Sequence, residues 1–157
     1  MRYRKVTYYS LLRDGEDYLE FDKFRRHHRN HPDHEVKQNY QDILALIDLM
    51  GKTTGCRDKF FKHEGAAHRL LTLALPQSGA YAEMLRLFCI RIGADVCVLL
   101  NGAVKNKRAR TAQECPNVAP HFLFANEVAT ALDRHIIDKE VKFHSYPLPI
   151  EFEIRSQ

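Results

Sequence analysis

The sequence predicts an α+β fold, with a curved antiparallel sheet, two N-terminal helices packed on one face and a C-terminal helix. Three observations lead to this prediction. Two amphipathic helical patterns fill residues 16–50, two apolar runs then meet at a turn over residues 93–95, and a third helical pattern covers residues 120–137. A chain of 157 residues is long enough for a proper core, so we expect one domain over residues 1–157.

The chain begins with a strand and a helix. Residues 6–12 are rich in β-branched and aromatic side chains and predict a strand, which a turn at residues 13–15 ends. Residues 16–28 predict the first helix, because ring-bearing side chains recur along them at helical spacing: Tyr18, Phe21, Phe24 and His28. Pro32 cannot continue this helix, and Asp33 is a suitable N-cap for the next one.

A second helix and the sheet segments follow. Residues 34–50 predict this helix, which Gly51 ends, because one face is apolar throughout: Val36, Tyr40, Ile43, Leu44, Ile47 and Met50. Residues 59–62 and 68–75 predict a strand or a strand pair. Residues 84–101 predict an antiparallel hairpin with mostly apolar faces, which indicates central sheet.

One residue does not fit the apolar hairpin. Arg86 lies between Leu85 and Leu87, in the middle of the first strand. A guanidinium group at a strand centre must stay solvated or be paired. Either this part of the sheet is a concave face open to an anionic partner, or Arg86 forms a salt bridge with one of the chain's carboxylates. The sequence leaves both open.

The third helix and the tail complete the chain. Pro120 suits a first helical position, and the inward face is apolar: Phe122, Ala125, Val128, Ala129, Leu132 and Ile136. Residues 138–157 predict an extended C-terminal strand or arm, because Pro147 and Pro149 exclude a central strand. With two helices on one face of the sheet, we expect the opposite face to be partly open.

Composition favours a cytoplasmic globular protein. Hydrophobic residues make up 45% and charged residues 28% of the chain, and no apolar run approaches the roughly 20 residues needed to cross a membrane. No apolar signal segment follows the basic N-terminus. The four cysteines show no Cys-x-x-Cys spacing, and Cys89 and Cys97 fall in apolar strands, which is typical of reduced core thiols.

The net positive charge of the chain is small, but basic residues are concentrated in one segment. The net charge is only +4, but four cations crowd the segment after the hairpin: Lys105, Lys107, Arg108 and Arg110. This cluster suits a phosphate-binding rim or, alternatively, a solvated basic loop. Four histidines, His27, His28, His31 and His34, invite a metal interpretation. Pro32 breaks the helix that would hold them, so we expect no metal and no cofactor.

Several segments resemble, in order and spacing, the RelE/ParE toxin superfamily, nearest its HigB-like branch. The resemblance covers roughly residues 6–135. It rests on the segments Tyr18–Phe24, Leu46–Gly51, Phe60–Lys62, Arg69–Leu71, Leu85–Phe88 and Val98–Lys107, and on the third helix with Ala125 and Ala129. It implies a RelE-like fold and the toxin of a type II toxin–antitoxin system, a metal-independent endoribonuclease that cleaves mRNA, usually in the ribosome. The implied partner is a cognate antitoxin of the helix-turn-helix, DNA-binding type.

Such cleavage needs a base for the 2′-hydroxyl, a cation for the phosphorane and an acid for the leaving 5′-oxygen. Arg86 is the candidate cation, since a guanidinium group binds phosphate oxygens in a bidentate way. The neighbouring strand region supplies the other candidates near it: Lys62, His63, His68 and Arg69. The candidate acids in the tail are His144 and Tyr146. The candidate RNA-binding residues are Lys59, Arg91, Lys105, Lys107, Arg108 and Arg110.

Two other functions stay open. The same fold acts by protein binding in the gyrase-inhibiting branch of the superfamily. An inactive member could also be retained for partner binding alone, an alternative suggested by Asn106, which separates Lys105 from Lys107. Replacing Arg86 distinguishes the nuclease from both, because only an RNA-cleaving site would lose its toxicity with fold and partner binding intact.

Overall fold

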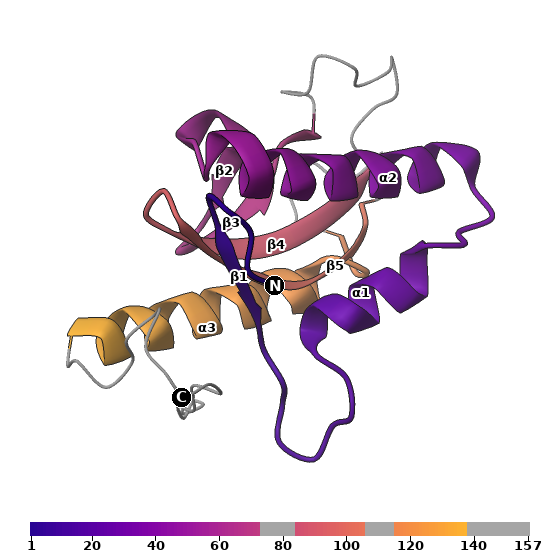
Figure 1. Ribbon diagram of the computed structural model, residues 1–157. Coiled ribbons are helices and arrows are strands. Elements are labelled where there is room, and N and C mark those ends of the chain that lie inside the picture. The colour runs from indigo at the N-terminus through magenta and orange to yellow at the C-terminus, as the bar shows by residue number, and fades with distance from the viewer. Residues whose placement is uncertain (73–83, 106–114, 138–157) are drawn as a thin grey trace.

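The computed structural model describes residues 1–72, 84–105 and 115–137. Over these ranges the protein is α+β, with a five-stranded mixed sheet and three α-helices (Figure 1). The strand order is β1-β5-β4-β3-β2. The strands are β1 (Thr7–Ser10), β2 (Phe61–Glu64), β3 (Ala67–Leu70), β4 (Leu85–Ile92) and β5 (Val96–Val104).

The sequence predicted an antiparallel sheet, but the sheet is mixed. β1 pairs with β5 in parallel, with Thr7 opposite Val96 and Ser10 opposite Leu99, whereas the pairs β2–β3, β3–β4 and β4–β5 are antiparallel. The chain leaves β1 for two helices and returns at the far edge of the sheet, so the first strand pairs with the last. A strand of four residues carries no pattern that specifies this direction.

The predicted hairpin is confirmed as β4 and β5, joined by the turn at Gly93–Asp95. Its register shifts between Leu87 and Cys89, where β5 contains one extra residue. Gly102 lies opposite Leu87 at this irregularity, and a Cβ added there would overlap the carbonyl oxygen of Arg86. The absence of a side chain at Gly102 therefore lets the two strands approach.

Two helices cover one face of the sheet. α1 (Glu20–His28) and α2 (His34–Leu49) pack through their predicted apolar faces against one core. Asp33 caps α2 as predicted, because its side chain accepts hydrogen bonds from the backbone N–H groups of Glu35 and Val36. The sheet side of this core consists of Tyr8, Phe61, Leu70, Leu85, Leu87, Cys89, Cys97 and Leu99.

The opposite face is not left open. α3 (Ala119–Ile137) lies across it (Figure 1) and shares a second core with the sheet. The sheet side of that core consists of Ala67, Phe88, Ile90, Val98 and Leu100, and the helix contributes Phe122, Ala125, Val128, Ala129 and Leu132. The expectation of a partly open face was wrong because the apolar stripe of α3 needs the same burial as those of α1 and α2.

Helix and strand boundaries differ from the prediction mainly at the ends. α1 begins at Glu20 rather than Glu16, and α2 continues into a π-helical turn, Met50–Thr54. All four cysteines, which lie within the described residues, are buried and form no disulfide. Among the described residues, no helix has the length and apolar character that crossing a membrane requires. The predicted C-terminal strand or arm, residues 138–157, lies outside the described residues.

Candidate functional site

Five charged side chains gather at one end of the α3-covered face. We call them the arginine cluster: Lys62, Glu64, Arg69, Arg86 and Lys105. Strand register explains the grouping, since Lys62 pairs with Arg69 and Arg69 pairs with Phe88, which points into the α3 core. Alternation along each strand then places Glu64 and Arg86 on the same face. The sequence-predicted residues Lys62, Arg69, Arg86 and Lys105 thus come together.

Glu64 lies at the centre of the arginine cluster. Its Oε1 accepts a hydrogen bond from Arg69 Nε at 2.9 Å and another from Arg86 Nη1 at 3.4 Å. The three side chains are only 12%, 6% and 11% exposed, respectively. Of the two alternatives for Arg86, a salt bridge is therefore confirmed. Counting only the described members of the cluster, four cations surround this one carboxylate, so positive charge is in excess.

The electrostatics of the arginine cluster act on Lys105. Partial burial, followed by the charges of Arg86, Arg69 and Lys62, lowers the pKa of the Lys105 ammonium, while Glu64 opposes this change. A lysine in such surroundings releases its proton more readily than an isolated one. An anion entering the cluster would meet two guanidinium groups and two ammonium groups, which is the chemistry that recognises phosphate.

Asn126 of α3 holds the turn that carries Glu64. Its Oδ1 accepts a hydrogen bond from the Ala66 N–H at 2.6 Å, and its Nδ2 donates to the carbonyls of Glu64 and Phe122, both at 2.9 Å. Gly65 has φ +66°, and a Cβ at this position would collide with the Asn126 side chain. Sequence analysis missed both Glu64 and Asn126. A polar residue beside Ala125 in the apolar stripe of α3 was the available signal.

Two sequence-predicted catalytic residues, His63 and His68, are not in the arginine cluster. They pair across β2 and β3 on the face of Phe61 and Leu70, which α1 and α2 cover. The prediction grouped them with Lys62 by sequence proximity, but successive residues of a strand point to opposite faces. His63 and His68 therefore lie across the sheet from Arg86.

The surroundings of His68 fit a structural role. Its Nδ1 accepts a hydrogen bond from the Arg91 backbone N–H at 3.3 Å, so the proton of the neutral ring is on Nε2. Burial, the neighbouring His63 ring at 4.7 Å and Arg91 together lower the pKa of His68. A neutral ring whose acceptor nitrogen is already bonded is a poor general base.

The predicted RNA-binding residues Arg91 and Lys59 also lie away from the arginine cluster. Arg91 is at the other end of β4, on the His68 face, where Nη1 pairs with Asp58 at 2.8 Å and Nε donates to the Cys56 carbonyl at 2.7 Å. Lys59 lies 5.1 Å from the centre of the Phe60 ring. The remaining candidates fall outside the described residues: His144, Tyr146, Lys107, Arg108 and Arg110.

The histidine-rich end of α1 does not form a metal centre. Within the described ranges, no group of three or more histidine, cysteine, aspartate or glutamate residues is arranged to hold a metal ion. His28 is instead buried, with Nε2 3.4 Å from the Gly102 carbonyl oxygen and its ring 4.8 Å from that of Phe24. Burial lowers the pKa of His28 to about 4, so the ring is neutral at pH 7.

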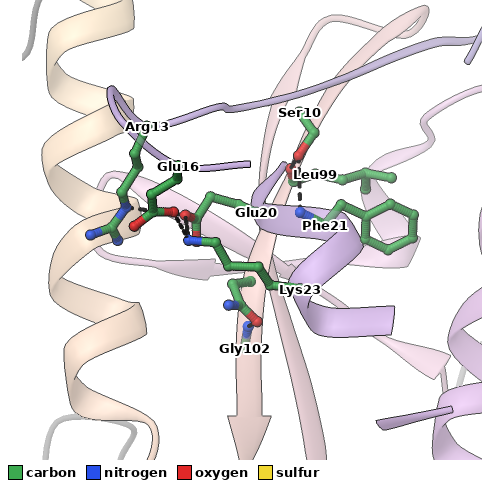
Figure 2. Close-up of polar contacts among 9 residues, drawn as sticks. Ser10, Arg13, Glu16, Glu20, Phe21, Lys23, Leu99 and Gly102 are labelled. Carbon is green, nitrogen blue, oxygen red and sulfur yellow. Dashed lines mark hydrogen bonds and ion pairs between the residues drawn. The ribbon is translucent and has the colours of Figure 1, made fainter. Parts of the chain in front are cut away.

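A second polar cluster joins the start of α1 to α3. We call it the Glu20 cluster: Arg13, Glu16, Glu20 and Lys23 (Figure 2). Glu20 is 1% exposed and binds Arg13 Nε at 3.1 Å and Lys23 Nζ at 2.6 Å, while Glu16 pairs with Lys23. The Arg13 guanidinium group also lies 3.6 Å from the centre of the Phe124 ring of α3. The Glu20 cluster contains two carboxylates and two cations, so it has no net charge.

No family model matches the chain, no curated protein matches it, and no solved structure matches it.

Proposed function

We propose that the protein is an endoribonuclease toxin of a type II toxin–antitoxin system, and that the scissile phosphate of mRNA binds at the arginine cluster. One observation carries the proposal. Lys62, Arg69, Arg86 and Lys105, which are distant in sequence, meet on one face of the sheet around Glu64. The sequence resemblance to the RelE/ParE superfamily adds independent support, because two of the segments that resemble the superfamily contain Arg86 and Lys105.

The chemistry follows from these side chains. The 2′-hydroxyl attacks the adjacent phosphorus, and a 2′,3′-cyclic phosphate forms as the bond from phosphorus to the 5′-oxygen breaks. The 5′-oxygen leaves with a proton from water. Arg86 and Arg69 stabilise the negative charge that develops on the phosphorane. Lys105, whose pKa is lowered, is the candidate base for the 2′-hydroxyl, and Lys62 binds the flanking phosphate. We propose the ribosome as the place of cleavage and a helix-turn-helix antitoxin as the inhibitor.

The test is induced expression of the wild type and of Arg86→Ala, with growth measured and transcript 5′ ends mapped. We expect the wild type to arrest growth and produce new mRNA ends, and Arg86→Ala to do neither while remaining folded. Arg25→Ala is the matched control, because this exposed arginine of α1 is far from the cluster in the chain and pairs only loosely with Asp22, at 3.9 Å. Harmless, folded wild-type protein would refute the toxin proposal.

One observation favours a second function. His63 and His68 lie across the sheet from Arg86, and Glu64 already compensates part of the arginine charge. A protein that acts by binding, either as a gyrase-type inhibitor or as an inactive partner-binding member, needs no base at this site. Growth arrest without new mRNA ends would favour the gyrase-type inhibitor.

A further inference from the structure

We propose that Glu64 is a positioning residue of the arginine cluster. It directs the Arg69 and Arg86 guanidinium groups toward one phosphate position, and its negative charge weakens RNA binding. The inference rests on the proposed function and deepens it, because it separates the affinity of the site from its geometry. Nothing in the chemistry of RNA cleavage requires a carboxylate between two arginines, so its presence needs a reason.

The geometry supports a positioning role. A single oxygen, Glu64 Oε1, accepts from both Arg69 Nε and Arg86 Nη1, which ties side chains of β3 and β4 to the end of β2. All three side chains are largely buried, so these hydrogen bonds are shielded from water and hold the groups firmly. An arginine side chain otherwise has many rotamers, and a misplacement of about 1 Å in an active site can lower a rate about a hundredfold.

The turn beneath Glu64 is itself anchored. Asn126 bonds to both the Glu64 carbonyl and the Ala66 N–H, and it uses the space that Gly65 leaves open. This carboxamide fixes the turn at the end of β2 to α3. Asn126 therefore positions Glu64, and through Glu64 the two guanidinium groups.

The charge of Glu64 works in the opposite direction. RNA affinity depends on the number of phosphates that cations neutralise, and the logarithm of the binding constant falls with the logarithm of salt concentration by about 0.7 per contact on a single strand. Removing the Glu64 charge should therefore strengthen binding and steepen this salt dependence by about 0.7. A residue that merely supports the fold would give weaker binding when replaced.

Two variants separate geometry from charge, using purified full-length protein, a short single-stranded RNA and measurements of both binding and cleavage. Glu64→Gln removes the charge, and we expect about threefold to tenfold tighter RNA binding with at least tenfold slower cleavage. Glu64→Asp keeps the charge but withdraws the carboxylate by one methylene, and we expect unchanged binding with a similar loss of cleavage. Opposite effects on affinity and rate are the signature of the proposed role.

Two further variants serve as controls. Asp133→Asn makes the same change in net charge at an exposed position of α3, and we expect less than a twofold effect on both measurements. Asn126→Ala loosens the anchored turn without changing charge, and we expect severalfold slower cleavage at unchanged RNA affinity. Thermal melts confirm that each variant is folded at the assay temperature.

A readout independent of cleavage keeps this inference distinct from the proposed function. We expect the Arg69 Nε–H signal in ¹⁵N NMR spectra to be sharp and slowly exchanging in the wild type and broadened in Glu64→Gln. If the wild type binds RNA without cutting it, the nuclease proposal fails, while tighter binding and a broadened signal in Glu64→Gln still establish positioning.

Three outcomes would overturn the inference. Binding and cleavage that fall together in Glu64→Gln would make Glu64 purely structural. Faster cleavage in Glu64→Gln would make it an inhibitory contact. Full activity in Glu64→Asp, with loss of the acidic limb of the pH–rate profile in Glu64→Gln, would make the carboxylate a base rather than a positioning group.

Discussion

Two clusters in the described part of the chain are built around a carboxylate, and they differ in what surrounds it. Glu20 is held by Arg13 and Lys23, which are 42% and 29% exposed, and Glu16 completes a cluster without net charge. Glu64 is held by two largely buried arginines, with Lys62 and Lys105 nearby. The Glu20 cluster joins α1 to α3 and has no net charge. The described residues of the arginine cluster carry more positive than negative charge. Excess positive charge, rather than burial or pairing, therefore distinguishes the proposed binding site from the Glu20 cluster.

Removing the Glu20 carboxylate should have the largest effect on stability. Glu20→Ala leaves Arg13 and Lys23 beside a buried space without their common partner, and we expect a loss of about 3 kcal/mol in the free energy of unfolding. Urea denaturation followed by circular dichroism measures this loss. RNA affinity at a temperature where the variant is folded should not change; a large drop would mean that the Glu20 cluster also binds RNA.

Replacing one arginine in each cluster sharpens the comparison. Arg69→Ala should lower RNA affinity about tenfold and reduce the salt dependence of binding by about 0.7, because one phosphate contact is lost. Arg13→Ala should leave both unchanged and cost about 1 kcal/mol of stability through its ion pair and its contact with Phe124. Fluorescence anisotropy across a salt series measures affinity, and equal effects of the two changes would refute the distinction.

Acidification should weaken the α1 side of the protein. Burial holds the pKa of His28 at about 4 in the folded state, against about 6.5 in the unfolded chain, so the unfolded state binds more protons between these values. The His28 contribution to stability is therefore complete above about pH 6.5, and about 2 kcal/mol of it is lost by about pH 5. His121 and His68, whose pKa values burial also lowers, add to this loss. Unfolding at several pH values should show a flatter dependence in His28→Gln, and an equally steep one would exclude His28 as a source.

Replacing Glu16, the most exposed acid of the Glu20 cluster, should have the smallest effect on stability and RNA affinity. Glu16 pairs with Lys23 at the surface, and the hydrogen bond from Lys23 lowers the pKa of Glu16. Glu16→Gln should shift neither the unfolding midpoint nor RNA affinity measurably, because water screens exposed pairs. A clear loss of stability would show that the cluster acts as one unit.

Sequence analysis predicted helices and hairpin because their patterns are local. The apolar face of residues 34–50, the Asp33 cap and the turn at Gly93–Asp95 each indicate one structure within a short window. The direction of β1 and the covering of the second face depend on contacts between distant segments, which periodicity does not encode. Arg86 was singled out because a charged residue in an apolar strand is conspicuous even without a structure.

Predicting which residues form the site requires the register between β2, β3 and β4, and the sequence does not specify that register. Glu64 was not singled out, and His63 and His68 were grouped with Lys62. Alternation along β2 would have separated Lys62 from His63. Placing Lys62 beside Arg69 and Arg86 needs the two-residue turn at Gly65–Ala66 and the pairing of Arg69 with Phe88. The pairing of Glu64 with the two arginines becomes visible only in three dimensions.

The close approach of β4 and β5 at Gly102 has a consequence for mutational tolerance. Any side chain there would collide with the carbonyl oxygen of Arg86, and His28 of α1 lies against the Gly102 carbonyl on the other face. In a scan of all substitutions selected for activity, position 102 should therefore be as restricted as position 86, although its residue has no side chain to offer a ligand. Glycine is required there for space rather than for chemistry.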